Sequence, residues 1–236
     1  RQKKFEEAIK YLKKALTIEN NNISALRNLG MIYSHIGNLD EAISYLDKTI
    51  NLDSNDHQSK YILAQIQLYK KRFKEGWKNY DSRWLCEYFK EKKFFSSKPL
   101  LTNLDNLNNV FIWPEQGIGD QIMYGSMINQ FSKLCNKLTV RLDERLIKLF
   151  DRKNPDVKFI GKKDNINDAE FDHHMSLVDL GKFFRLNTNE FKKTKFPYIT
   201  YEKKLYTKIK NSFEKKNQFT IGISWTSKNK EIGQDK

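Results

Sequence analysis

The sequence predicts a solenoid of paired α-helices followed by an α/β domain with a Rossmann-like, doubly wound parallel sheet. Two observations favour this fold class. Apolar and small residues recur every 34 residues over the first hundred residues, and short apolar strands alternate with helical segments from Val110 onward. These patterns divide the chain into residues 1–98, residues 105–216 and residues 217–236, where the third segment begins a further unit.

The composition is that of a globular chain with a sizeable core. Of the 236 residues, 39% are hydrophobic, and the net charge is +14. The lysines are scattered over helix faces, which favours a solvated surface over a nucleic-acid interface. Cys86 and Cys135 lack metal-ligand spacing and are interpreted as free thiols of a reducing compartment. No apolar run is long enough to span a bilayer. We therefore expect a cytoplasmic protein, with the periphery of the inner membrane as the alternative.

Positions that are 34 residues apart carry similar side chains, which is the period of tetratricopeptide repeats. The aligned sets are Phe5, Leu39 and Phe73; Ala8, Ala42 and Gly76; and Leu12, Leu46 and Tyr80. The small residues let paired helices approach closely, and the larger ones fill the gaps between repeats. About two and a half repeats are present. They either bind a protein partner or self-associate through their groove, or they position the next domain. The sequence slightly favours positioning, because no ladder of Asn or aromatic residues marks the concave side.

The third repeat ends in an aromatic-rich segment. We predict that Trp77 and Trp84 join the repeats to the next domain. The alternative is an exposed aromatic patch that stacks on sugars.

The second domain is predicted from alternating strands and helices. The strands are expected at 110–113, 138–142, 157–160 and 171–174, the helices at 144–150, 177–184 and 201–215, and a further strand at 219–225. Asp143 is the expected cap of the helix at 144–150. Ligands of parallel sheets bind beyond the carboxyl ends of the strands. Residues 117–120, His174 and Ser227 follow or end predicted strands, so we expect them to converge at one edge.

The stretch from Trp113 to Gln121 predicts a strand, a glycine-rich turn and the start of a helix. Gly117 and Gly119 can adopt positive φ and let a ligand approach the backbone. Free N–H groups at the start of the helix favour an anion there. Asp120 either caps this helix or acts on a substrate.

Five stretches resemble bacterial tetratricopeptide-repeat proteins with a glycosyltransferase domain, which are similar to heptosyltransferases and, more distantly, to O-linked N-acetylglucosamine transferase. The stretches are Phe73–Trp77 with Tyr80 and Arg83, Trp113–Asp120, Phe171–His174, Phe196–Ile199 and Ile221–Trp225. The second resembles the family's W-x-E-Q-G-x-G-D motif and is quite specific. The chain departs from the family pattern at Pro114, Ser176, Asp179 and Gly181.

The resemblance implies a two-lobed GT-B transferase that moves a sugar from a nucleotide-sugar to a glycan, lipid or protein acceptor, without a metal or cofactor. The chain would hold the first lobe and the opening of the second, and we expect it to be inactive alone. By the same resemblance, Asp120 matches the catalytic base, while Ser227 and Lys236 would bind the donor. The alternative is a protein-interaction scaffold whose α/β domain has lost its chemistry.

The remaining candidate residues come from two of these stretches, residues 113–121 and residues 171–174. His174 is a second candidate base, although a lone histidine at a strand end is more often a hydrogen-bonded structural residue. Glu115 either pairs with a lysine to hold the loop or binds substrate. A zinc site on the two histidines is disfavoured, because neighbouring strand residues point to opposite faces. The residues expected to bind substrate are Glu115, Gln116, Gly117, Gly119, Gln121 and Asp172.

Overall fold

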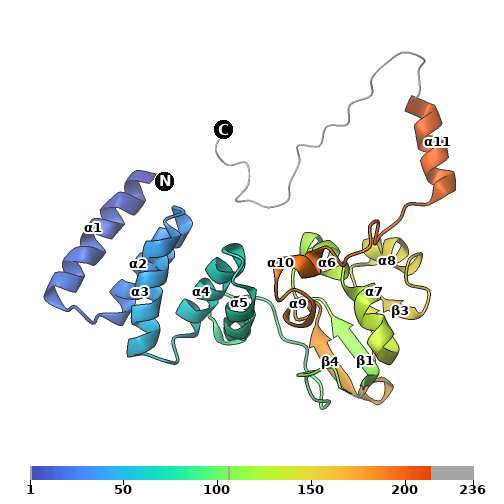
Figure 1. The fold of residues 1–236 in the computed structure, drawn as a ribbon, viewed down its shortest axis with the longest axis horizontal. Coiled ribbons are helices and arrows are strands. Elements are labelled where there is room, and N and C mark those ends of the chain that lie inside the picture. The colour runs from blue at the N-terminus through green and yellow to red at the C-terminus, as the bar shows by residue number, and fades with distance from the viewer. Residues whose placement is uncertain (1, 106, 214–236) are drawn as a thin grey trace. The chain divides into compact units, whose positions relative to one another are not determined.

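The chain begins with helices that pack in sequence, each against the next (Figure 1). The computed structural model describes residues 2–105 and 107–213. Its first five helices are α1 (Gln2–Ile18), α2 (Ile23–His35), α3 (Leu39–Leu52), α4 (His57–Tyr69) and α5 (Phe73–Tyr80). Residues 1–199 form one compact unit and residues 200–236 another, in which the described helix is α11 (Lys203–Phe213).

Small residues allow the helices of the repeats to pack closely, as the 34-residue period predicts. A Cβ atom on Gly30 would lie 2.7 Å from the side chain of Leu46, and one on Gly76 would lie 2.7 Å from Leu68. Ala42 and Leu46 have no exposed surface. The core of the repeats therefore depends on glycine or alanine at these positions, because a larger side chain would force the helices apart.

A parallel sheet follows the repeats. Its strands are β1 (Leu107–Trp113), β2 (Cys135–Arg141), β3 (Val157–Ile160) and β4 (His173–Ser176). They lie in the order β3-β2-β1-β4, and all neighbouring strands are parallel. The chain thus extends the sheet from β1 in one direction and then returns to the other side of β1, which is the arrangement of a doubly wound fold. The fold class predicted from the sequence is confirmed.

Side chains of β1 alternate between two apolar clusters. Val110 and Ile112 belong to the main core, together with residues from helices on that face of the sheet. Phe111 and Trp113 belong to a second cluster, which Trp84 and other aromatic residues cover. The helices and short 3-10 helices after the repeats are η1 (Asp81–Leu85), α6 (Ile118–Gly125), α7 (Ile128–Phe131), η2 (Ser132–Leu134), α8 (Glu144–Asp151), η3 (Asp168–Glu170), α9 (Leu180–Phe184) and α10 (Thr188–Phe191).

Most of the predicted elements are present, with shifted ends. The strand at 157–160 has the predicted bounds, and Asp143 caps α8 by accepting a hydrogen bond from the backbone N–H of Arg145. The predicted strand at 171–174 is wrong by two residues. Phe171 is buried in the aromatic cluster, but it precedes β4 rather than belonging to it. The expected strand at 219–225 lies outside the described residues.

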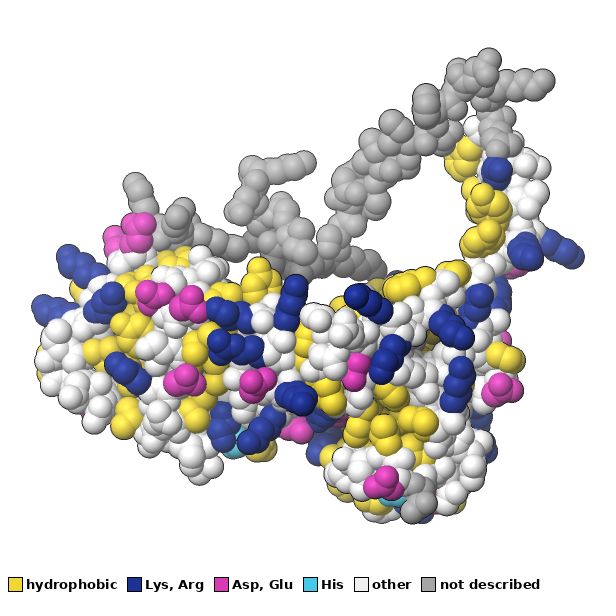
Figure 2. Space-filling model, in the orientation of Figure 1, with side chains coloured by type: hydrophobic (Ala, Val, Ile, Leu, Met, Phe, Trp, Pro, Cys, Tyr) yellow, Lys and Arg dark blue, Asp and Glu magenta, His cyan; other side chains and the backbone are white. Residues whose placement is uncertain are grey.

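Figure 2 shows lysine and arginine side chains dispersed over the face drawn, with acidic side chains between them. On that face, the positive charge is not gathered into a single strip. This distribution agrees with the solvated surface that the sequence predicts.

Candidate functional site

A cavity of about 570 Å³ lies beyond the carboxyl ends of β1, β2 and β3. Residues 91–95 form one side of it, and residues 113–117, which end β1 and lead to α6, form another. Arg141 contributes from the end of β2, and Lys162 contributes from the loop after β3. This is the edge of the sheet at which doubly wound folds bind their ligands.

The lining has more basic than acidic residues, and we call this the cationic cavity. Its basic residues are Lys92, Lys93, Arg141 and Lys162, and its acidic residues are Glu91 and Glu115. The guanidinium of Arg141 lies 5.0 Å from the ring centre of Phe111, and one of its terminal nitrogens donates to the carbonyl oxygen of Asp164 at 2.9 Å. Its Nε is buried and has no acceptor among the described residues. An anion in the cavity would supply that acceptor.

The glycine-rich turn lies at the border of this cavity. Gly117 is the N-cap of α6, and no side chain caps the helix. Asp120 is the third residue of α6, so the interpretation of Asp120 as the N-cap is wrong. Positive φ at Gly117 and Gly119 is also wrong, because Gly117 is extended with φ −62° and Gly119 lies within α6. A Cβ atom on Gly117 would lie 3.7 Å from Oδ2 of Asp120, which places that half-buried carboxylate near the cavity border.

A buried ion-pair network lies at the carboxyl ends of the paired strands β1 and β4. Arg83, which is 0% exposed, donates from Nε and Nη2 to the two carboxylate oxygens of Glu115 at 2.9 and 2.8 Å. Nη2 also donates to Asp179 at 2.9 Å, and the hydroxyl of Ser176 donates to Glu115 at 2.5 Å. Burial raises the pKa of Glu115, and the bonds from Arg83 and Ser176 oppose that shift. The expected lysine partner of Glu115 is therefore wrong, because an arginine from the end of the repeats takes that place.

Two glutamines hold the turn in place. Gln121 is buried, and its amide donates to the carbonyl oxygen of Gln116 and accepts from the backbone N–H of Asp143. These two bonds tie the turn to the loop after β2. Gln116 donates to the hydroxyl of Tyr80 at 3.1 Å and also lines the cavity. Of the two, Gln116 is the one that can reach a ligand in the cavity.

His174 and Asp172 do not lie at the cavity, contrary to the expected convergence. His174 is the second residue of β4 and is buried. Its Nδ1 accepts from the indole of Trp113 at 3.0 Å, and its Nε2 lies 3.1 Å from the carbonyl oxygen of Lys98. Asp172 precedes β4 and accepts from the backbone N–H of Asn109, early in β1. It is therefore at the amino-terminal edge of the sheet.

The donor-binding residues expected from the sequence, Ser227 and Lys236, lie outside the described residues. Within the described part of the chain, no group of three or more His, Cys, Asp or Glu side chains is placed to hold a metal ion. The same part of the chain contains no helix with the length and apolar character needed to cross a bilayer.

Sequence reasoning did not identify the cations of the cavity. Arg141 is the last residue but one of the strand predicted at 138–142, and the pattern of that strand does not reveal that this side chain faces a cavity. Lys92 and Lys93 belong to a lysine-rich segment that resembles any solvated surface. Arg83 is the functional residue near this turn that the family resemblance did identify. It contacts the turn after β1 through Glu115.

Comparisons with known proteins identify the repeats. Residues 1–66 match the family model of the tetratricopeptide repeat, which confirms the assignment made from the 34-residue period. The crystal structure of MamA is similar, with 28% identity and a TM-score of 0.32, and the match covers 34% of this chain and 47% of that one. A mutant of the O-GlcNAc transferase of Thermobaculum terrenum shares 12% identity with a TM-score of 0.30, over 69% of this chain and 38% of that one.

The chain therefore spans less than half the length of either structure. Curated protein sequences gave no match. The findings define a protein in which tetratricopeptide repeats precede a Rossmann-like α/β domain.

Proposed function

We propose that this chain is the acceptor-binding part of a glycosyltransferase that moves a sugar from a nucleotide-sugar to a hydroxyl group of a glycan, lipid or protein. The observation that carries the proposal is the cationic cavity beyond β1 and β2, with Asp120 in the helical turn at its border. The position of the cavity supports it, because it lies at the carboxyl edge of a parallel sheet, where doubly wound folds bind ligands. The resemblance of Trp113–Asp120 to a transferase motif agrees with this assignment.

Asp120 is the proposed general base. The acceptor oxygen forms a bond to the anomeric carbon of the donor, the bond between that carbon and the diphosphate oxygen breaks, and the hydroxyl proton moves to the carboxylate of Asp120. A positioned base contributes about 10²–10⁴-fold to the rate. The cavity cations orient an anionic group of the acceptor, and Gln116 offers its amide to the same ligand. The proposal involves no metal or cofactor.

The donor belongs to a second lobe in this proposal. By the family resemblance, Ser227 and Lys236 are the residues of this chain assigned to the donor. The repeats carry a protein partner or a second copy of the chain. We expect nucleotide-sugar to bind weakly to the 236-residue chain and to be transferred only by a protein that also contains the second lobe.

The test is Asp120→Asn in a protein that contains both lobes. An amide cannot take a proton at neutral pH, so we expect the transfer rate to fall at least ~10²-fold. The melting temperature should hardly change, because Asp120 does not cap the helix. Asp172→Asn is the matched control, since Asp172 lies at the opposite edge of the sheet and should leave the rate unaltered. Wild-type turnover in Asp120→Asn would refute the assignment of the base.

A protein-interaction scaffold is the second candidate, favoured by the family match of residues 1–66. It predicts that no donor is hydrolysed or transferred by the folded protein. It also predicts that substitutions on the surface of the repeats abolish capture of a partner.

A further inference from the structure

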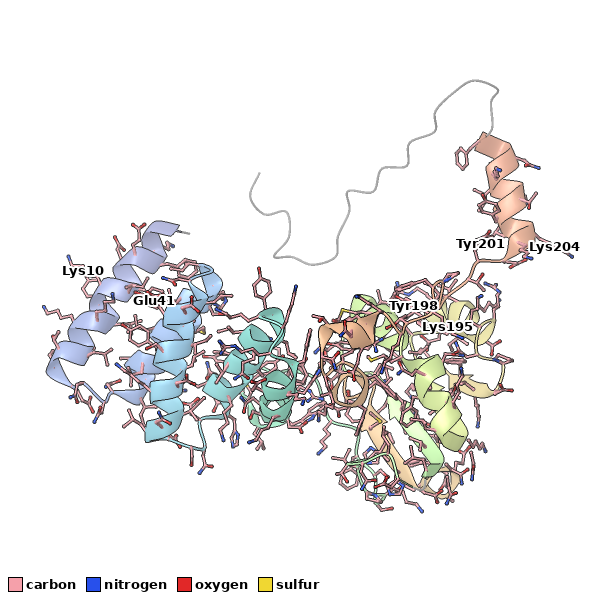
Figure 3. All side chains as sticks on the ribbon, in the orientation of Figure 1. Lys10, Glu41, Lys195, Tyr198, Tyr201 and Lys204 are labelled. Atoms are coloured by element: carbon pink, nitrogen blue, oxygen red, sulfur yellow. The ribbon has the colours of Figure 1, made fainter. Side chains whose placement is uncertain are left out.

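A second cavity, of about 600 Å³, is separate from the cationic one and shares no lining residue with it. Its wall is largely apolar. Phe73 and Trp77 contribute from α5, Met123 contributes from α6, and Phe196 and Tyr198 contribute from the segment that follows α10. Tyr198 is labelled on that segment in Figure 3. The volume lies within the range of roughly 300–1,000 Å³ that is typical of small-molecule sites.

Arg185 is the charged group of this wall. Its side chain belongs to a residue that is only 5% exposed. It donates to the carbonyl oxygen of Phe184 and to the hydroxyl of Thr194, both at 2.6 Å, and its guanidinium lies 5.2 Å from the ring centre of Phe191. Both accepting oxygens are uncharged. Among the described residues, no carboxylate forms an ion pair with Arg185.

The charge of Arg185 is therefore not neutralised at short range. Burial lowers its pKa, and the more distant carboxylate of Glu190 opposes that shift. An arginine stays protonated at neutral pH even after such a shift. A buried cation without a counter-ion is unfavourable, and an anion in the adjoining cavity would relieve this cost.

We propose that this cavity binds a single-chain amphiphile with a carboxylate head. The planar guanidinium of Arg185 matches the two oxygens of a carboxylate, and the alkyl chain lies along the apolar wall. A peptide fits the wall less well, because its backbone amides would lie without partners against apolar side chains. The site uses neither Asp120 nor the cationic cavity, although Gly119, next to Asp120 in α6, contributes to its wall.

The test is a calorimetric titration of the 236-residue chain with decanoate below its micellar concentration. Decan-1-ol provides the same chain without the charge, and acetate provides the head without the chain. We expect saturable 1:1 binding of decanoate, with affinities at least about tenfold lower for the other two. Equal affinity for decanoate and decan-1-ol, or no saturable binding of decanoate, would overturn the proposal.

Two variants separate recognition from folding. Arg185→Met should remove the preference for decanoate over decan-1-ol. Met123→Glu places a negative charge in the wall at a residue that is 54% exposed, so the fold should tolerate it while decanoate binding weakens at least about tenfold. Leu134→Glu is the matched control, because Leu134 is 44% exposed and does not line the cavity.

Equal loss of binding in Met123→Glu and Leu134→Glu would contradict the site. The proposal would also be contradicted if an apolar peptide with a free carboxyl end bound at least about tenfold more tightly than decanoate. That result would assign the cavity to a protein partner.

Discussion

The polar side chains near the ends of the strands differ in whether their hydrogen-bonding atoms already bond to other groups of the protein. Gln121 and His174 are buried, and each makes two hydrogen bonds to groups of the protein. A ligand could bind them only by displacing these bonds, which would leave buried groups without partners. Asp120 makes no capping hydrogen bond to α6, and the Nε of Arg141 has no hydrogen-bond partner among the described residues. They are therefore the groups most ready to bind a ligand.

Acid should destabilise the domain through His174. Because Nδ1 accepts from the indole of Trp113, the proton of the neutral ring is on Nε2, which donates to the carbonyl of Lys98. Burial lowers the pKa of His174. The folded pKa is then below the unfolded value of about 6.5. The stabilisation is complete above that value and is lost as the pH falls through it toward the folded pKa.

The measurement is the midpoint of denaturant unfolding between about pH 5 and pH 8, where unperturbed histidine titrates. His174→Gln should remove much of the loss of stability on acidification. His35→Gln is the control, because His35 is exposed and should leave the slope as it is. An unchanged slope in His174→Gln would show that another group is responsible.

Part of the site can be predicted from the sequence, because part of it is local. The turn and Asp120 follow directly from a strand, two glycines and an acid. The cavity itself depends on residues 91–95, which contact the ends of strands that come later in the chain. The expected position of His174 at the cavity is wrong because of a strand end. The predicted strand ends at His174, whereas β4 continues to Ser176.

Equivalent helix ends in successive repeats have the same backbone geometry and different residues. After α2, Gly37 has φ 82°, and after α4, 34 residues later, Lys71 has φ 62°. In both cases, the backbone N–H of this residue and that of the following residue donate to carbonyls in the last turn of the helix, as in a Schellman motif. Glycine adopts this conformation without strain, whereas a residue with a Cβ atom does not.

Lys71→Gly should therefore stabilise the repeats by about 1 kcal/mol, because it removes the left-handed strain at that position. Gly37→Ala should destabilise them by about 1–2 kcal/mol for the same reason. Chemical denaturation measures both. Lys74→Gly, an exposed change inside α5, is the control and should cost about 0.5–1 kcal/mol. A loss of stability in Lys71→Gly would mean that the side chain of Lys71 contributes more than the strain removes.

At the level of elements, the sequence predicts what depends on periodicity. The 34-residue spacing locates the repeats, and the apolar run at Val157–Ile160 locates β3. The aromatic residues that cover the second face of the sheet could not be predicted from periodicity. Trp84 and Phe94 pack there against Phe111 and Trp113, although they precede the whole sheet in the chain. Contacts between residues so far apart leave no periodic pattern in the sequence.

The last repeat and the sheet domain are joined by an interface of buried groups. Trp77 is buried and donates from its indole to the carbonyl oxygen of Arg185, and its ring occupies the space that a Cβ atom on Gly181 would need. Trp84 packs against Trp113 with ring centres 5.5 Å apart. Both tryptophans contact the second domain, as the sequence predicts. Because these contacts and the pair of Arg83 and Glu115 join the two parts, the stability of the repeats and that of the sheet domain depend on each other.

The last prediction is that the repeats and the sheet domain unfold together, with the buried pair of Arg83 and Glu115 as the coupling. Arg83→Met leaves the carboxylate of Glu115 buried without its cation and should cost about 3–5 kcal/mol. Adding Glu115→Gln should recover part of that loss, so a double-mutant cycle should give a coupling energy of at least about 1.5 kcal/mol.

The exposed pair of Lys158 and Glu170 is the matched control, and its cycle should give about 0–1 kcal/mol. Helical circular dichroism and tryptophan fluorescence should then follow a single transition in the wild type, because both units lose their shared interface at once. In Arg83→Met the two signals should separate, with the helices of the repeats melting apart from the sheet. A single transition in Arg83→Met, together with a coupling energy no larger than that of the exposed pair, would show that the aromatic contacts alone hold the two parts together.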